Sequence, residues 1–183
     1  MASYNIAVLV GSIRKDSFNR QLAKALEKLF PAEFGFTQVR IDDLPLYNQD
    51  DDASPAASVT RLKGEIIAAQ GVLFFTPEYN RSIPGVLKNA IDQASRPYGK
   101  SVWNGKPAGV IGASVGPIGT ALAQQHLRNI LAYLNMPTLG QPEAFIHHKE
   151  GLYGAVGNIG EASKEFLQSW VDSDVAWVKP HQA

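Results

Sequence analysis

Three short apolar runs constrain the fold of this chain most strongly. They cover residues 6–10, 71–75 and 108–111, and each is continuous rather than alternating, with turn-forming residues around it. Such runs are typical of strands buried on both faces, as in a parallel sheet covered by helices. A fourth segment, residues 36–41, alternates and is expected nearer an edge, and a short fifth strand is expected at residues 144–146.

The segments between these runs carry apolar residues at helical spacing. The first ends at Pro31, the second is centred on residues 62–69, and the third follows Ser82 and Pro84. The fourth stops before Pro137, and the fifth surrounds residues 166–171. Strands that alternate with helices indicate right-handed βαβ units. We therefore predict an α/β, flavodoxin-like three-layer sandwich over residues 1–183, as one domain with a five-stranded parallel sheet of order 2-1-3-4-5.

Composition excludes several classes of protein. The 17 basic and 17 acidic residues cancel, which disfavours a nucleic-acid partner. No apolar run reaches the roughly 18 residues that span a bilayer, and the N-terminus lacks the basic region of a signal peptide. The absence of cysteine excludes disulfides and thiolate metal sites. We expect a cytoplasmic protein without a membrane partner or a metal, in which residues 48–58 form a solvated loop.

The first polar loop, residues 11–20, follows a predicted buried strand and opens a helix. The free N–H groups of a helix N-terminus attract anions. Ser12, Ser17 and Asn19 add short polar side chains, and Arg14 adds a guanidinium suited to phosphate. The loop matches neither the dinucleotide fingerprint nor the Walker pattern. It predicts a phosphate site, with a plain polar turn capped by Ser17 as the alternative.

The second loop, residues 76–85, offers a flat aromatic face within a stiff segment. Pro77 and Pro84 limit its flexibility, while Tyr79 and Asn80 offer a ring and an amide. A heteroaromatic ligand needs a surface to lie against and hydrogen bonds at its edge. The alternative is a rigid turn in which Tyr79 only packs.

The third loop contains a Gly-x-Ser-x-Gly pattern centred on Ser114, which matches the nucleophile elbow of α/β-hydrolases. A hydrolase needs a separate acid and then a histidine further along the chain. Glu143 lies only four residues before His147, and His181 lies two residues from the chain end. A serine hydrolase that uses Ser114 is therefore a minor alternative.

Taken together, these loops resemble those of the NAD(P)H-dependent FMN reductase family, and most of all its quinone and chromate reductases. The resemblance rests on Gly11-Ser12-Ile13-Arg14 with Ser17, on Pro77-Glu78-Tyr79-Asn80, and on residues 84–92. It implies that FMN phosphate is bound by Ser12, Arg14, Ser17 and Asn19. It implies that the isoalloxazine ring is contacted by Pro77, Glu78, Tyr79, Asn80 and Ser82, and by Ser114, Val115 and Gly116. Arg81 stands where many members have Gly, and Gln93 where many have Trp.

The resemblance also implies an activity. It predicts an NAD(P)H:acceptor oxidoreductase, with NADPH or NADH as co-substrate and ping-pong hydride transfer through flavin N5, so that no catalytic side chain is required. Quinones are the expected acceptors, with chromate, ferricyanide and azo dyes as further ones. A homodimer or homotetramer is implied, and we hypothesise that Arg128 joins Glu143 in an intersubunit network. A flavodoxin-like electron carrier is the main alternative, although such carriers are usually strongly acidic.

Overall fold

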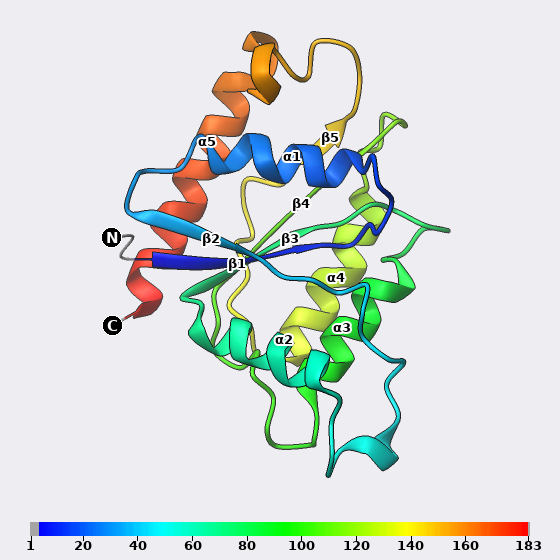
Figure 1. Cartoon of the computed structure of the whole chain (residues 1–183). Helices are drawn as coiled ribbons and strands as arrows, with labels where there is room; N and C mark the ends of the chain where they lie inside the picture. Colours follow the sequence, from blue (N-terminus) through cyan, green and yellow to red (C-terminus); the bar gives the residue numbers. More distant parts are fainter. Residues whose placement is uncertain (1–3, 183) are drawn as a thin grey trace.

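Five parallel strands form the centre of the molecule in the computed structural model, which describes residues 4–182 (Figure 1). The strands are β1 (Tyr4–Val10), β2 (Phe34–Gln38), β3 (Gly71–Phe75), β4 (Ala108–Ser114) and β5 (Phe145–His147). Their order is β2-β1-β3-β4-β5, and each neighbouring pair is parallel. The predicted fold class and strand order are confirmed.

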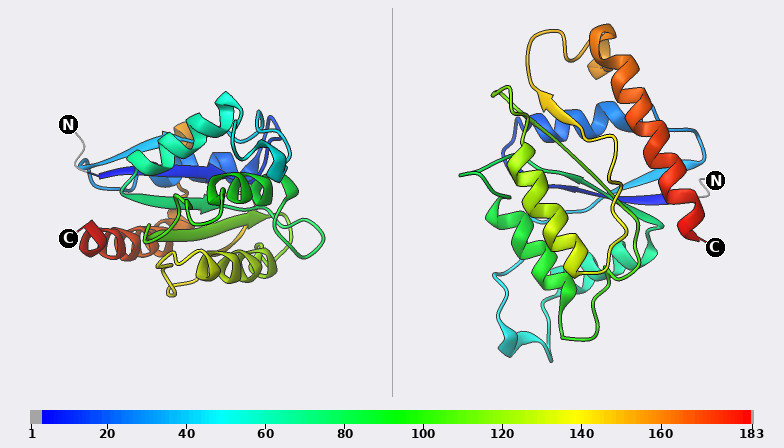
Figure 2. Two further views of the ribbon diagram at one scale, coloured as in Figure 1. Left: turned by 90° about the horizontal axis from the view of Figure 1, so that it is seen from below. Right: turned by 180° about the vertical axis from the view of Figure 1, so that it is seen from behind.

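Helices cover both faces of the sheet (Figure 2). The helices are α1 (Phe18–Glu27), α2 (Ala57–Ala68), α3 (Gly85–Ser95), α4 (Ala121–Tyr133) and α5 (Glu161–Val178). One core cluster joins α1 and α5 to the sheet, and a second joins α2, α3 and α4 to the opposite face. The result is the predicted three-layer arrangement.

Strand β1 is buried on both faces, which explains the continuous apolar run at residues 6–10. Ile6, Val8 and Val10 belong to the core cluster under α1 and α5. Ala7 and Leu9 belong to the cluster under α2, α3 and α4. Because successive side chains of a strand point to opposite faces, both faces must be apolar when both are covered.

The second strand lies earlier in the sequence than predicted. Its pairing with β1 runs from Tyr4 opposite Phe34 to Val8 opposite Gln38, so β2 ends at Gln38. Val39 and Ile41 continue beyond the strand and are buried in the core cluster under α2, α3 and α4. The apolar alternation that suggested a strand to residue 41 therefore reflects burial of the following segment.

The segment predicted to be a solvated loop, residues 48–58, is partly helical. It contains a short 3₁₀ helix, Gln49–Asp51, and the first two residues of α2. Within residues 4–182, no three His, Asp or Glu side chains are grouped so that they could hold a metal ion. None of the helices described combines the length and apolar character needed to cross a bilayer.

Candidate functional site

The three polar loops meet at the carboxyl ends of β1, β3 and β4, on the right of Figure 1. Between them lies a cavity of about 190 Å³. Its lining residues are Ser12, Arg14, Ser17, Phe18, Asn19, Pro77, Glu78, Tyr79, Ala113, Ser114 and Val115. Of the residues that we predicted from the sequence, Asn80, Ser82 and Gly116 do not line this cavity. The convergence follows from the strand order, since β1 and β3 flank the topological switch point.

The first loop is shaped by hydrogen bonds to its own helix. Ser17 is the N-cap of α1, and its hydroxyl accepts a hydrogen bond from the Arg20 backbone N–H at 3.2 Å. The Arg20 guanidinium donates to the carbonyls of Ser12 and Arg14, each at 3.3 Å. Arg20 therefore holds the loop closed, a role that its position in the sequence did not reveal.

Arg14 keeps its positive charge available at the cavity. Its side chain is exposed, donates to the Asp16 carbonyl, and lies with its guanidinium carbon 4.5 Å from the centre of the Phe18 ring. Among residues 4–182, no carboxylate forms an ion pair with it. An unpaired guanidinium beside a helix N-terminus suits an anionic group.

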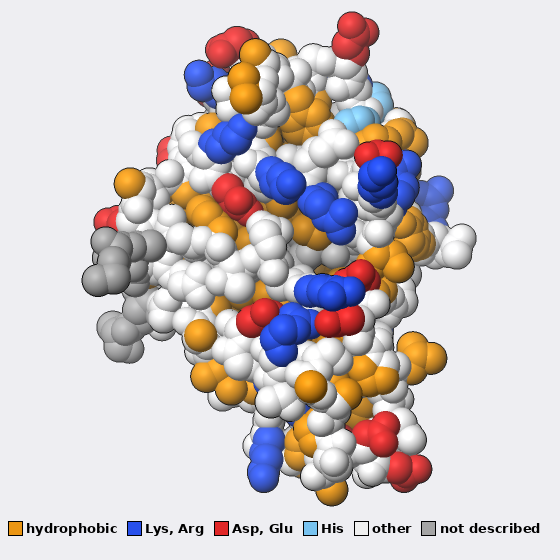
Figure 3. Space-filling model, viewed as in Figure 1, with side chains coloured by type: hydrophobic (Ala, Val, Ile, Leu, Met, Phe, Trp, Pro, Cys, Tyr) orange, Lys and Arg blue, Asp and Glu red, His pale blue; other side chains and the backbone are white. Residues whose placement is uncertain are grey.

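The basic residues near β2 differ from Arg14 in this respect. Figure 3 shows Lys and Arg interspersed with Asp and Glu on the face that carries α1 and β2. Arg40 Nε lies 2.7 Å from an Asp42 oxygen, and Arg61 pairs with Asp43 and Glu65, each at 2.9 Å. These pairs neutralise the cations that lie between β2 and α2.

Asn19 connects the first loop to the third. Its side-chain nitrogen donates to the Ala113 carbonyl at 3.0 Å, and its side-chain oxygen accepts from the Ala113 N–H at 2.9 Å. The residue is buried, and both the nitrogen and the oxygen of its amide are engaged in these two contacts. Asn19 thus lines the cavity, but its side chain positions β4 against α1 instead of facing a phosphate.

The second loop contains a tight turn of two residues at its tip. Tyr79 and Ser82 exchange two backbone hydrogen bonds of 3.0 Å each, and Asn80 and Arg81 between them have φ angles of 52° and 66°. Two successive positive φ angles are typical of a type I′ turn. Tyr79 is 52% exposed at the cavity edge, so its ring is not used up in core packing.

Glu78 fixes this turn to α4. One carboxylate oxygen accepts from the backbone N–H groups of Leu122 at 3.0 Å and Ala123 at 3.2 Å. The N-cap of α4, Thr120, supplies no side-chain cap, so Glu78 takes over that function from 44 residues away. Nearby, Ser82 Oγ lies 3.0 Å from His126 Nδ1. Sequence reasoning foresaw neither contact.

Arg81 occupies a backbone conformation that favours glycine. We expect Arg81→Gly to raise the free energy of unfolding by about 1 kcal/mol, because left-handed φ angles strain a side-chain-bearing residue. The pair with Glu78, at 3.3 Å, offsets little of this gain because Arg81 is 66% exposed. Urea denaturation at constant pH measures the effect. Asn80→Gly is the matched control and should gain less, since Asn tolerates this region; an Arg81→Gly protein less stable than the parent would contradict the prediction.

The third loop does not form a hydrolase site. The Ser114 hydroxyl donates to the Gly116 carbonyl at 3.0 Å and not to a histidine, although β4 and β5 place His147 opposite Ser114. Gly112 is required for another reason: a Cβ there would lie 2.1 Å from the Thr76 carbonyl oxygen. The glycine of the Gly-x-Ser-x-Gly pattern therefore reflects close approach of β3 and β4.

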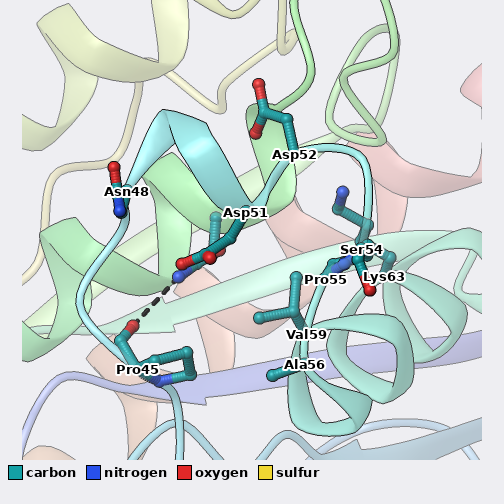
Figure 4. Close-up of a pocket in the computed structure, with 10 residues that line it drawn as sticks. Pro45, Asn48, Asp51, Asp52, Ser54, Pro55, Ala56, Val59 and Lys63 are labelled. Atoms are coloured by element: carbon teal, nitrogen blue, oxygen red, sulfur yellow. Dashed lines mark hydrogen bonds between the residues drawn. The ribbon is translucent and has the colours of Figure 1, made fainter.

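A second cavity, of about 240 Å³, lies apart from the three loops (Figure 4). It is formed by the segment before α2, by α2 itself and by Gln93 of α3, whose side chain donates to the Pro45 carbonyl at 2.9 Å. None of the residues predicted as flavin contacts lines it. The cavity at the ends of β1, β3 and β4 is thus the one that unites the predicted site residues.

Known proteins resemble this chain over nearly its whole length. Residues 4–151 match the family model described as NADPH-dependent FMN reductase. A 2-hydroxy-1,4-benzoquinone reductase from Burkholderia sp is 54% identical over 175 residues, covering 95% of this chain and 96% of the relative. A quinone reductase from Pseudomonas putida is 46% identical, covering 98% and 97% of the two chains. The solved structure of FerB, a flavoenzyme NAD(P)H:(acceptor) oxidoreductase from Paracoccus denitrificans, has a TM-score of 0.94 at 48% identity and covers 97% of this chain and 98% of its own.

Proposed function

This chain belongs to the NADPH-dependent FMN reductase family, and on that basis we propose that it is an NAD(P)H:quinone reductase. FMN is its cofactor and NAD(P)H its reductant, as the family implies. The observation that carries the proposal is a cavity in which an unpaired guanidinium beside a helix N-terminus adjoins a turn with an exposed aromatic ring. FMN has a phosphate and a flat ring joined by a short chain, and so matches both parts.

The residues present fit the phosphate end of FMN. Ser12 and Ser17 bring hydroxyl groups to the N-terminus of α1, and Arg14 brings an unpaired guanidinium. A phosphate dianion prefers such a mixture of hydroxyls, backbone N–H groups and a bidentate cation. The cavity lining supplies no carboxylate near these three residues, and Glu78 on the far loop is occupied with α4 and Arg81.

The residues of the second and third loops fit the ring end. Pro77 and Tyr79 offer a rigid edge and an aromatic surface, and Ser114 and Val115 line the same cavity. Asn80 and Ser82, which do not line the cavity, shape and anchor the turn. Tight turns leave their backbone groups fixed in direction, which is what hydrogen bonding to the edge of a heteroaromatic ring requires.

The protein orients the reactants and supplies no acid or base of its own. When bound between the first and second loops, FMN would supply the hydride-transfer chemistry. Exposed Tyr79 and Val115 at the rim leave one face of the site open to a flat partner. We propose that NAD(P)H and the acceptor use this face in turn, which gives ping-pong kinetics.

Quinones are the acceptors that the site suits best. The rim combines an exposed aromatic ring with apolar side chains, and flat apolar rings stack favourably on such surfaces. Two relatives are named for quinone reduction. Chromate, ferricyanide and azo dyes are smaller or bulkier acceptors, and their reduction stays a prediction.

The test is a steady-state assay of the purified protein with its flavin content determined in the same preparation. We expect a yellow protein that NAD(P)H bleaches without any partner, and parallel double-reciprocal plots when NADPH and a benzoquinone are varied together. An electron carrier would bind flavin but fail to be bleached. A colourless protein that neither binds FMN nor oxidises NADPH would falsify the proposal.

The subunit assembly and cellular location stay predictions. Within the chain, Arg128 donates to the Leu139 carbonyl at 2.6 Å, and Glu143 accepts from Gln125 at 2.8 Å. Burial lowers the pKa of Arg128, and Glu143 counteracts this shift, which indicates that the two charges are near each other. We propose a dimer or tetramer, with Arg128 and Glu143 in its contact, and a site of action in the cytoplasm.

A further inference from the structure

A row of three neighbouring aromatic rings, of which the first two are stacked, adjoins the first loop and ends at Arg14. The Arg14 guanidinium lies over the Phe18 ring at 4.5 Å. Phe18 is also stacked on His148, with ring centres 3.8 Å apart and planes at 24°. His148 in turn contacts Tyr153, with ring centres 5.8 Å apart. Of these four residues, only Arg14 and Phe18 line the cavity.

The far end of the row is anchored to the scaffold. The His148 backbone N–H donates to the Ser114 carbonyl at 2.8 Å, so its position follows from the end of β4. Tyr153 donates its hydroxyl to the Phe18 carbonyl at 3.3 Å. The segment that carries Tyr153 runs beside α1 (Figure 1), where Lys28 donates to the carbonyl of Val156 at 2.8 Å.

Burial favours the uncharged forms of His148 and Tyr153, so that Arg14 carries the charge in this group of residues. The His148 Nδ1 atom is buried and, among the residues described, has no hydrogen-bond partner. Burial lowers the pKa of His148, and the charges of Arg14 and His147 lower it further. Burial also raises the pKa of the Tyr153 phenol, which therefore stays a donor. A neutral imidazole can stack on Phe18 without repelling the Arg14 guanidinium that contacts the same ring.

We propose that His148 is a positioning residue for the flavin phosphate, acting through Phe18 to hold the Arg14 guanidinium toward the cavity. An exposed arginine otherwise samples many rotamers, and ordering it on binding costs conformational entropy. A Phe18 ring that is held in place by His148 gives the Arg14 guanidinium one preferred position beside the site. Arg14 therefore loses less conformational entropy when phosphate binds. This inference rests on the proposed FMN site and adds a residue that touches neither the cavity nor the ligand.

The test measures the Kd of FMN by fluorescence quenching for His148→Ala and its rescue by His148→Phe. We expect His148→Ala to weaken FMN binding roughly five- to tenfold, because Phe18 then loses the ring that holds it in place under the Arg14 guanidinium and the cation–π contact is weakened. His148→Phe, which keeps a stacked ring, should bind within about twofold of the parent. His147→Ala is the matched control, because His147 is exposed and precedes His148 directly; it should bind as the parent does.

A double-mutant cycle shows whether the effect passes through Arg14. If His148 acts as proposed, His148→Ala has little further effect on Kd in an Arg14→Ala background. A loss that is undiminished in that background, a parent-like Kd for His148→Ala, or a failure of His148→Phe to restore binding would each overturn the inference. Thermal unfolding of each variant separates lost binding from lost folding. A parent protein that does not bind FMN would refute the proposed function itself, which is a different outcome.

Discussion

Arg14→Ala is expected to weaken FMN binding between about tenfold and a hundredfold. Hydrogen bonds from a guanidinium to phosphate are charge-assisted and contribute roughly 1.5–3 kcal/mol. Arg14 lines the cavity and forms no ion pair with a carboxylate in the described part of the chain, so no competing partner reduces this contribution. The measurement is the Kd of FMN at fixed salt, together with the flavin retained after gel filtration.

Two further variants define this effect. Lys15→Ala removes a neighbouring charge that is also exposed but does not line the cavity, and should change Kd little. Arg14→Lys should restore part of the affinity, because it keeps the charge but loses the bidentate geometry. If Arg14→Ala and Lys15→Ala had the same Kd, general electrostatic attraction would explain binding and the assigned role of Arg14 would be wrong.

Asp174→Asn is expected to stabilise the protein by about 2–4 kcal/mol at pH 8. Asp174 lies on the buried face of α5, and a Cβ added at Gly109 of β4 would come within 2.4 Å of its Oδ1 atom. Neither carboxylate oxygen has a hydrogen-bond partner among the residues described. Burial raises the pKa of Asp174 from 3.8 to about 7. A shift of about three pKa units corresponds to at most roughly 4 kcal/mol.

The sign of the pH dependence follows from this raised pKa. Between pH 4 and pH 7 the folded protein keeps a proton on Asp174 that the unfolded chain has lost, so the free energy of unfolding falls as the pH rises. Above pH 7 the buried Asp174 carboxylate destabilises the folded protein by its full amount, and below pH 4 this destabilisation vanishes. The advantage of Asp174→Asn over the parent should therefore shrink steadily as the pH is lowered from 8 to 4.

Chemical denaturation at several pH values measures this dependence. Asp172→Asn is the matched control, because Asp172 lies exposed on the same helix and its Oδ1 atom accepts a hydrogen bond from Gln168 Nε2 at 2.9 Å. It should leave the pH profile of stability unchanged. A constant difference between Asp174→Asn and the parent from pH 4 to pH 8 would show that Asp174 has an ordinary pKa in the folded protein.

Local signals in the sequence were enough to predict the layers and the convergence of the three loops. Continuous apolar runs require a sheet covered on both faces, and the helical spacing between them supplies the covers. Parallel strands place their following loops at one edge, so Ser12, Tyr79 and Ser114 had to be near one another. The Ser17 cap of α1, which the sequence offered as the alternative role of that residue, also depends only on residues within the same ten positions.

The tertiary structure alone decided which polar groups are already used by the protein itself. Asn19 has a side chain of the type that binds phosphate, but its amide is hydrogen-bonded to the backbone of Ala113, 94 residues away. Glu78 caps α4, and His148 is stacked on Phe18, through contacts between segments that no sequence spacing relates. Periodicity and turn chemistry depend on neighbours along the chain and can be read from it. The partners of a side chain depend on how the layers pack, and that is settled only when distant segments meet.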